Sequence, residues 1–246
     1  MNLLVERKEK DIYMQLERAA FSGPFSFLGP QYQSTDIALR VWLPGATSVS
    51  ARLSSNQKNY VLHTEPSQEG MFILNEPLDL TDQHYQLVVN WNGIEQVIDD
   101  PYQYHDIAPS DTQAHTPKEM YNHLGAHIMT VERCGESVQG VRYVVFAPNA
   151  SAVSVIGDFN QWDGRRHPMQ RIDNGLWALF IPEHATGVKY KFELKGPQGE
   201  ALPHKMDPFG AHNEQYPSFA SVVYDQASYQ WQDSAWQTRP VQIHFL

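Results

Sequence analysis

The first stretch with a clear pattern of hydrophobic and polar positions is Glu6 to Ala20. Its apolar residues recur at helical spacing on one face, with Glu and Lys on the opposite face: Ile12, Leu16, Ala19 and Ala20. Gly23-Pro24 then interrupts the pattern, because proline cannot continue a helix. We therefore expect one short amphipathic helix that packs on the module after it.

From Ile37 the period changes to two, which is typical of β-strands. Short apolar or alternating runs follow one another: Ile37–Leu43, Val49–Leu53, Tyr60–Leu62, Met71–Leu74, Tyr85–Trp91 and Ile94–Ile98. Asn92-Gly93 is the strongest hairpin turn, because both residue types accept a positive φ. The segment Asp99-Asp100-Pro101-Tyr102 marks the end of this group of predicted strands. Many short strands without intervening helices predict an antiparallel β-sandwich.

The second half repeats the landmarks of the first half in the same order. The matched pairs are Phe27-Leu28-Gly29 with His123-Leu124-Gly125, Ile37–Pro44 with Val141–Pro148, Gly70-Met71-Phe72 with Gly175-Leu176-Trp177, Tyr85–Val88 with Tyr190–Glu193, and Asp100-Pro101-Tyr102 with Asp207-Pro208-Phe209. We predict an all-β fold of two tandem immunoglobulin-like antiparallel β-sandwiches with a short N-terminal helix.

The expected boundaries are 1–22 for the helix, 23–112 for the first sandwich, 113–230 for the second and 231–246 for a linker or tail. Asp111 to Glu136 lacks a strong period-two run, so we expect the connection between modules and the entry to the second.

Length, composition and charge limit the number of modules and the classes of molecule that this chain is expected to bind. With 246 residues, 41% of them hydrophobic, two modules with real cores are expected. The formal charge of −10 argues against nucleic acid and anionic membranes, whereas a neutral polymer is compatible. The single cysteine, Cys134, permits no internal disulfide, and neither a signal core nor a membrane-spanning apolar run is visible. We expect a soluble cytoplasmic protein.

The most informative chemistry lies in Val155 to Met169, where an apolar strand ends at Gly157 and a polar loop follows. Trp162 offers a flat face to the C–H face of a pyranose, and Asp158 and Asn160 offer groups for its hydroxyls. The equivalent segment of the first repeat, Ser54–Asn59, has no aromatic residue. A sugar site is therefore expected on the second sandwich.

The run from Trp162 to Met169 resembles bacterial 1,4-α-glucan (glycogen) branching enzymes, and its loop resembles the isoamylase N-terminal-like glycogen-binding module. The likeness extends from about Asp11 to about Trp236. Its firmest points are Asp99–Tyr102, Leu124–His127 and Phe146–Ala150.

The resemblance implies two sandwiches followed by an α-amylase-type barrel. In the family, an aspartate nucleophile and a glutamate acid/base in that barrel cut an α-1,4 link and transfer the chain to a 6-hydroxyl. Such a barrel needs about 250 residues, whereas ten residues follow Trp236, and Gln237–Leu246 departs from the family. We expect no catalytic residue, metal ligand or cofactor site in this chain.

The resemblance also implies a glucan site, with glycogen or maltooligosaccharide as ligand. Trp162 and Lys191 match the family's sugar-stacking tryptophan and lysine. A second tryptophan would fall at Glu200–Leu202, where the sequence has Glu-Ala-Leu, and a threonine and an asparagine would fall near Ser218 and Ala220. The expected glucan-binding residues are Trp162, Asn160, Asp158 and Lys191.

Each of these residues has an ordinary structural alternative. Trp162 could instead pack on the following barrel, and Lys191 could simply be a solvated strand residue. Asp158 and Asn160 could cap their own loop. Trp177 lies in an apolar run and is expected in the core.

Other residues with possible chemistry are expected to be structural. His123 and His127 stand four residues apart, but no helix pattern surrounds them and no acidic ligand completes a metal set. Asp99-Asp100 ends a strand beside a proline and recurs as Asp207-Pro208, which indicates turn chemistry. Cys134 lies in no nucleophile motif.

We interpret the chain as the N-terminal glucan-binding and positioning region of a branching enzyme, with the barrel as its partner. The alternative is a free-standing glycogen-binding or scaffold protein. An apolar patch near the tail would favour the first hypothesis and a polar surface the second. An immunoglobulin-like adhesion module is disfavoured because no signal segment is visible.

Overall fold

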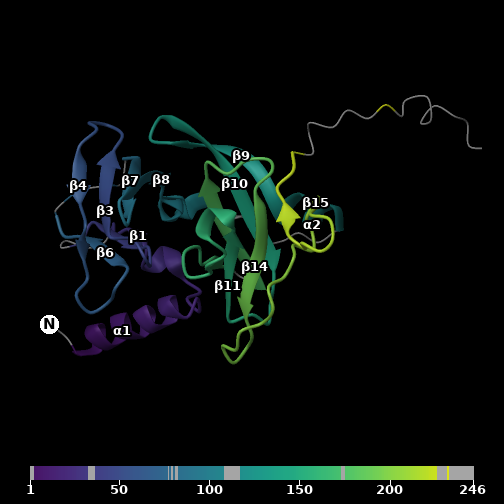
Figure 1. Cartoon of the computed structure of the whole chain (residues 1–246), viewed down its shortest axis with the longest axis horizontal. Helices are drawn as coiled ribbons and strands as arrows, with labels where there is room; N and C mark the ends of the chain where they lie inside the picture. The colour runs from purple at the N-terminus through teal and green to yellow at the C-terminus, as the bar shows by residue number, and fades with distance from the viewer. Residues whose placement is uncertain are drawn as a thin grey trace, which may run out of the picture.

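The computed structural model describes residues 3–32, 37–76, 78, 80, 83–107, 117–172, 175–225 and 232. They form two antiparallel β-sandwiches side by side, with a helix at one edge, which confirms the predicted fold class (Figure 1). The predicted tail at 231–246 lies outside the described residues apart from position 232. Within the described part, no helix is long and apolar enough to cross a membrane.

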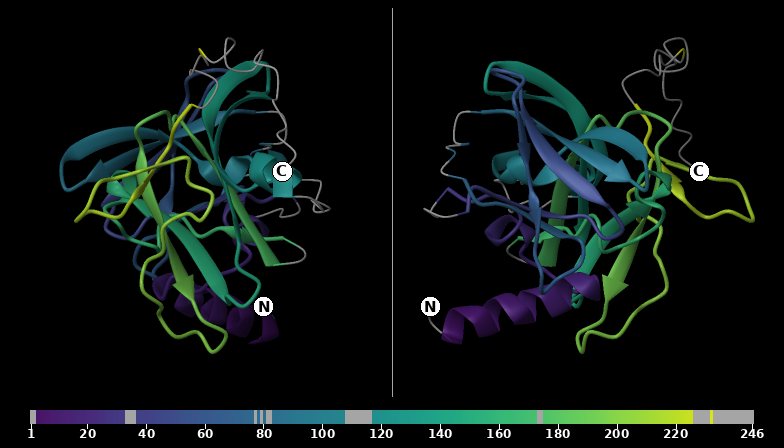
Figure 2. Two further views of the ribbon diagram at one scale, coloured as in Figure 1. Left: turned by 90° about the vertical axis from the view of Figure 1, so that its right-hand side faces the viewer. Right: turned by 60° about the vertical axis from the view of Figure 1, so that its left-hand side comes forward.

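The N-terminal helix α1 (Leu3–Glu17) lies below the sandwiches in each view (Figures 1 and 2). It ends three residues before the predicted Ala20, because Ala19 adopts a left-handed conformation with φ of 50°. The Ala20 N–H then donates to Gln15 O at 2.8 Å and the Ala19 N–H to Leu16 O at 3.1 Å. These two bonds form the Schellman arrangement that ends helices, here with alanine in place of the usual glycine.

The first sandwich consists of two four-stranded sheets, ordered β1-β2-β6-β5 and β4-β3-β7-β8. Its strands are β1 (Gly29–Pro30), β2 (Leu39–Trp42), β3 (Ser48–Leu53), β4 (Asn59–Val61), β5 (His63–Thr64), β6 (Met71–Leu74), β7 (Tyr85–Trp91) and β8 (Ile94–Asp99). The predicted Asn92-Gly93 turn joins β7 to β8, with φ of 52° and 97°. Short 3-10 helices flank the sandwich: η1 (Pro24–Ser26), η2 (Pro101–Gln103) and η3 (His105–Ile107).

The second sandwich follows helix α2 (Pro117–His123) and has sheets ordered β12-β13-β10-β9 and β11-β14-β16-β15. Its elements are β9 (Gly125–Arg133), β10 (Glu136–Phe146), β11 (Ala152–Gly157), η4 (Asp158–Asn160), β12 (Gln170–Arg171), β13 (Leu176–Pro182), β14 (Lys189–Lys195), β15 (His212–Asn213) and β16 (Ser221–Val222). Strand β9 lies in the stretch predicted to be a connection. Most of its residues are half-buried, so its alternation is weak in the sequence.

The predicted internal repeat is visible in the hydrogen bonds. Tyr85 Oη donates to Asp100 Oδ2 at 2.6 Å, and Tyr190 Oη donates to Asp207 Oδ2 at 2.6 Å. Each aspartate also accepts from the backbone N–H two residues later, at 3.0 Å and 2.8 Å. The two Asp-Pro motifs therefore serve turns, as the sequence predicts, and each anchors a buried tyrosine.

A glycine faces a proline at the same place in both repeats. Gly70 and Gly175 have φ of 88° and 81°, a region that side chains rarely adopt. A Cβ on Gly70 would lie 2.8 Å from Pro44 Cα, and one on Gly175 would lie 2.5 Å from Pro148 Cα. Both sandwiches therefore need glycine here for conformation and for space.

One hydrophobic core joins the two sandwiches and α1. It combines helix residues such as Leu16 and first-sandwich residues such as Trp42 and Met71 with the interior of the second sandwich around Trp177. A second cluster fills only the first sandwich. The two sandwiches therefore share a hydrophobic interface and are not independent domains joined only by a linker.

Candidate functional site

The loop after β11 is folded tightly, and Trp162 is half-buried in it. Gln161 and Trp162 both have left-handed backbone conformations, with φ of 58° and 60°. The Trp162 N–H donates to Gly157 O at 2.9 Å, which closes the loop. The indole Nε1–H of Trp162 donates to Asp158 Oδ1 at 2.9 Å. Asp158 therefore holds the orientation of the ring.

The side chain of Asn160 stabilises this loop from the protein interior. Its side chain is only 1% exposed. Its Oδ1 accepts from the Gly157 N–H at 2.9 Å, and its Nδ2 lies 2.9 Å from Val155 O and 3.0 Å from His167 Nδ1. Both ends of the amide are occupied inside the protein, so Asn160 shapes the loop and is not positioned to touch a ligand.

Lys191 lies beside the indole of Trp162. It belongs to β14, where it pairs with Ile156 of β11. Its Nζ lies 5.7 Å from the centroid of the Trp162 ring. This distance is within the range of a cation–π contact. The structure thus brings Trp162 and Asp158 of the loop after β11 together with Lys191 of β14.

Charged groups continue this surface along the sheet. Lys189 Nζ lies 2.5 Å from Glu214 Oε1. The pKa of Glu214 is lowered, first by the hydrogen bond from Lys189 and, among smaller contributions, by the charge of Lys191. Glu214, the first residue of the β15–β16 loop, therefore lies against Lys189 and close enough to Lys191 to be affected by its charge.

Two exposed aromatic residues occupy that loop, and the sequence analysis missed them. Tyr216 is 83% exposed and Phe219 is 50% exposed. Their ring centroids lie 5.6 Å apart at 74°. The signal in the sequence was two rings within an otherwise polar segment. At the position of the family's second tryptophan, Glu200 only closes a turn, accepting from the Gln198 N–H at 3.0 Å.

The remaining candidates have structural partners. Trp177 is fully buried and its Nε1–H donates to Ala147 O at 3.0 Å. His127 Nε2 lies 2.8 Å from Leu124 O. Among the described residues, no three His, Cys, Asp or Glu side chains gather as a metal site. Cys134 is exposed in the β9–β10 turn.

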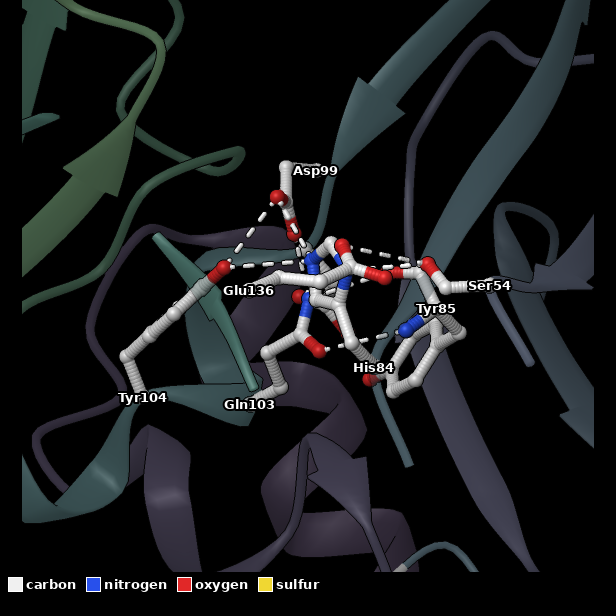
Figure 3. A network of polar contacts seen from close by, with 8 residues as sticks. Ser54, His84, Tyr85, Asp99, Gln103, Tyr104 and Glu136 are labelled. Carbon is white, nitrogen blue, oxygen red and sulfur yellow. Dashed lines mark hydrogen bonds and ion pairs between the residues drawn. The ribbon is translucent and has the colours of Figure 1, made fainter. Parts of the chain in front are cut away.

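A buried polar network joins the two sandwiches at the β9–β10 hairpin (Figure 3). His84 Nε2 lies 2.9 Å from Asp99 Oδ2, and His84 Nδ1 lies 2.8 Å from Glu136 Oε2. Ser54 Oγ also lies 3.0 Å from His84 Nδ1, and Tyr104 Oη donates to Asp99 at 3.1 Å. The two carboxylates raise the pKa of His84 against the opposing effect of burial. No sequence motif indicated this network.

Two other histidines are kept neutral by burial, and this should appear in the acid stability of the protein. Desolvation lowers the pKa of His167 from 6.5 to about 3 and that of His184 from 6.5 to about 4. Below pH 6.5, His167 and His184 therefore bind protons in the unfolded chain but remain unprotonated in the folded chain. We expect the free energy of unfolding to fall as pH decreases from 6.5 to 5.5, by up to about 1.4 kcal/mol per pH unit for each histidine.

Urea titrations of the wild-type chain and of the variants His167→Gln and His184→Gln would measure this slope. Each variant should flatten it, and an unchanged slope in both variants would show that these histidines are not the cause.

The fold is that of two tandem immunoglobulin-like β-sandwiches, and family models match each of them. Residues 123–210 match the family model of carbohydrate-binding module 48, the isoamylase N-terminal domain. Residues 9–102 match the model of the alpha-1,4-glucan branching enzyme GlgB N-terminal domain. The chain is therefore similar, domain by domain, to the N-terminal third of 1,4-alpha-glucan branching enzymes.

Individual relatives lead to the same family. The branching enzyme GlgB of Aliivibrio fischeri is 74% identical over 228 residues, which cover 93% of this chain and 32% of the relative. That of Vibrio parahaemolyticus is 54% identical over 237 residues, covering 96% of this chain and 31% of the relative. The chain thus spans about a third of the length of these relatives. A solved pullulanase from Anoxybacillus sp. LM18-11 aligns with 89% of the chain and 28% of its own, at 16% identity and a TM-score of 0.36, too low to support an argument.

Proposed function

We propose that this chain binds α-glucan through Trp162 and Lys191 and positions the polymer for a 1,4-α-glucan branching enzyme. The ligand would be glycogen or a maltooligosaccharide. The partner would be an α-amylase-type barrel that carries the catalytic carboxylates, as the resemblance to branching enzymes implies. With this role, the chain would work in the cytoplasm.

The proposal rests on one observation: the indole of Trp162 is held in a fixed orientation, and the ammonium group of Lys191 lies beside it. Trp162 is held by Asp158, so little side-chain entropy remains to be lost when a sugar stacks on it. Lys191 supplies hydrogen-bond donors within 5.7 Å of the ring centroid. A flat apolar face next to rigidly placed donors suits a pyranose, which has both an apolar face and peripheral hydroxyls.

The residues divide into contacts and supports. Trp162 and Lys191 are the proposed contacts, and Asp158 orients the indole while its outer oxygen remains available to a hydroxyl. Asn160 supports the loop from inside. The exposed Tyr216 and Phe219 extend the same surface and offer further stacking area, in place of the tryptophan that Glu200–Leu202 lacks.

Affinity electrophoresis through native gels with and without glycogen tests the proposal. We expect glycogen to retard the wild-type chain, and Trp162→Ala to weaken binding by about tenfold or more, because truncating a central aromatic anchor costs about 2 kcal/mol. Lys191→Ala should weaken binding less.

A matched control is Phe146→Ala, because Phe146 is 50% exposed but ends β10 in the opposite sheet. It should be retarded like the wild type. If glycogen retarded Trp162→Ala and the wild type equally, the Trp162 loop would not be part of the glucan-binding site. Absence of any retardation would refute glucan binding by this chain.

A further inference from the structure

A cavity of about 280 Å³ lies where the two sandwiches meet. The first sandwich contributes Trp91 and Gln96 to its lining, and the second contributes Arg166, His167, Glu183 and His184. Cavities at domain interfaces with aromatic walls and a few polar groups are common ligand sites. This cavity is separate from the Trp162 surface, although the loop that bears Trp162 also supplies Arg166 and His167.

One wall is an indole covered by a guanidinium. Arg166 Cζ lies 4.4 Å from the centroid of the Trp91 ring, and Arg166 Nη2 donates to Pro44 O at 3.1 Å. The Nε of Arg166 is buried and has no partner among the described residues. Trp91 Nε1 donates to Gln96 Oε1 at 3.1 Å. A buried donor without a partner next to a cavity indicates that a ligand or water atom completes its bonding.

The lining also carries two uncharged imidazoles. Asn160 Nδ2 donates to His167 Nδ1, because the Oδ1 of that amide already accepts from Gly157, so the proton of His167 is on Nε2. His184 Nδ1 lies 2.9 Å from Tyr143 Oη. Burial keeps the pKa of both histidines low, so both are neutral at pH 7. Within the described chain, neither Nε2 has a hydrogen-bond partner.

Charge and size restrict what can bind. Glu183, Asp99 and Asp100 all line the cavity, against the single cation Arg166, so an anionic ligand is disfavoured. Cavities for drug-sized ligands measure about 300–1,000 Å³, and this one is slightly smaller. Neutral imidazoles, an amide, a carboxylate and a guanidinium together offer both donors and acceptors, which hydroxyl groups require.

We propose that this cavity binds one neutral sugar ring, such as glucose or the end of a maltooligosaccharide. The ring packs on the edge of Trp91 and bonds through its hydroxyls to Arg166, His167, Glu183 and His184. Because both sandwiches supply walls, an occupant also stabilises their packing. The proposal does not depend on the Trp162 site.

Isothermal titration calorimetry with glucose tests the proposal on the intact chain. A ligand of this size should bind with a dissociation constant of about a millimolar. Trp162→Ala should retain glucose binding even where it loses glycogen retardation, whereas Trp91→Ala should lose about tenfold or more. Glu183→Gln should weaken binding, and Glu95→Gln is its matched control, because Glu95 is exposed on β8 and does not line the cavity.

Three outcomes would overturn the proposal. One is no heat of binding with the wild-type chain at high glucose concentration. Another is unchanged affinity in both Trp91→Ala and Glu183→Gln, each checked for folding by circular dichroism. The third is tighter binding of glucose 6-phosphate than of glucose, which would show that the cavity prefers an anion.

Discussion

Trp177→Ala should lower the free energy of unfolding by about 3–5 kcal/mol, the usual range for emptying a buried tryptophan position. Trp177 is completely buried in the core that joins α1 to both sandwiches. Its indole N–H also donates to Ala147 O at 3.0 Å, and the truncation removes this bond, although Ala147 O still accepts from the Ala150 N–H at 3.1 Å. The loss therefore combines a large cavity with one lost hydrogen bond.

Urea unfolding followed by far-UV circular dichroism measures this effect. A single transition is expected, because the shared core couples the two sandwiches. Phe146→Ala, which removes a half-exposed ring from the neighbouring strand, should change stability by less than about 1 kcal/mol. A loss below about 1 kcal/mol for Trp177→Ala would contradict its place in the core.

His84→Ala should lower the free energy of unfolding by about 3 kcal/mol, because it removes the partner of a buried carboxylate. The side chain of Asp99 is only 3% exposed, and it faces His84 at 2.9 Å (Figure 3). Tyr104 and Gln103 continue to donate to Asp99, which limits the loss. Glu136, on the second sandwich, loses its contact across the junction.

The effect of His84 should also depend on pH. Its pKa is raised in the folded state, so the protonated ring stabilises the fold fully below the unfolded pKa of about 6.5. This contribution is lost as pH rises through the folded pKa. Asp99, Glu136 and Tyr104 are the groups that face the ring.

The measurement is the stability difference between wild type and His84→Ala at several pH values. Subtraction at each pH removes the opposing contributions of His167 and His184, which both proteins share. The difference should shrink as pH rises, and Glu136→Gln should reduce that dependence. A difference that stays constant from acid to alkaline pH would mean that folding does not raise the pKa of His84.

The sequence was sufficient for features that depend on neighbouring residues. Alternation placed β7 at Tyr85–Trp91, and Asn92-Gly93 placed its hairpin. The Asp-Pro motifs were identified as turns and as a repeat, because the same short-range bonds form in both copies. A local conformation that the residue itself favours can be predicted without knowledge of its distant contacts.

Features that depend on distant residues could not be predicted. For Asn160 the sequence left a sugar contact and a cap of its own loop as alternatives, and the structure shows its side chain bonded within that segment, to Val155 O and His167 Nδ1. His84 and Glu136 are 52 positions apart, so nothing in either segment indicates the pair. Ala19 ends α1 early in a left-handed conformation that alanine rarely adopts, with its side chain buried, and its residue type gives no signal of this.

The shared core also determines how this part of the protein can be reused in engineering. A designer who wished to transfer only the second sandwich to another enzyme would cut through a hydrophobic interior. The cut would leave its interior exposed where Leu16, Trp42 and Met71 now cover it, and such a surface promotes aggregation. The smallest transferable cassette is therefore the pair of sandwiches together with α1, even where only the Trp162 surface is wanted.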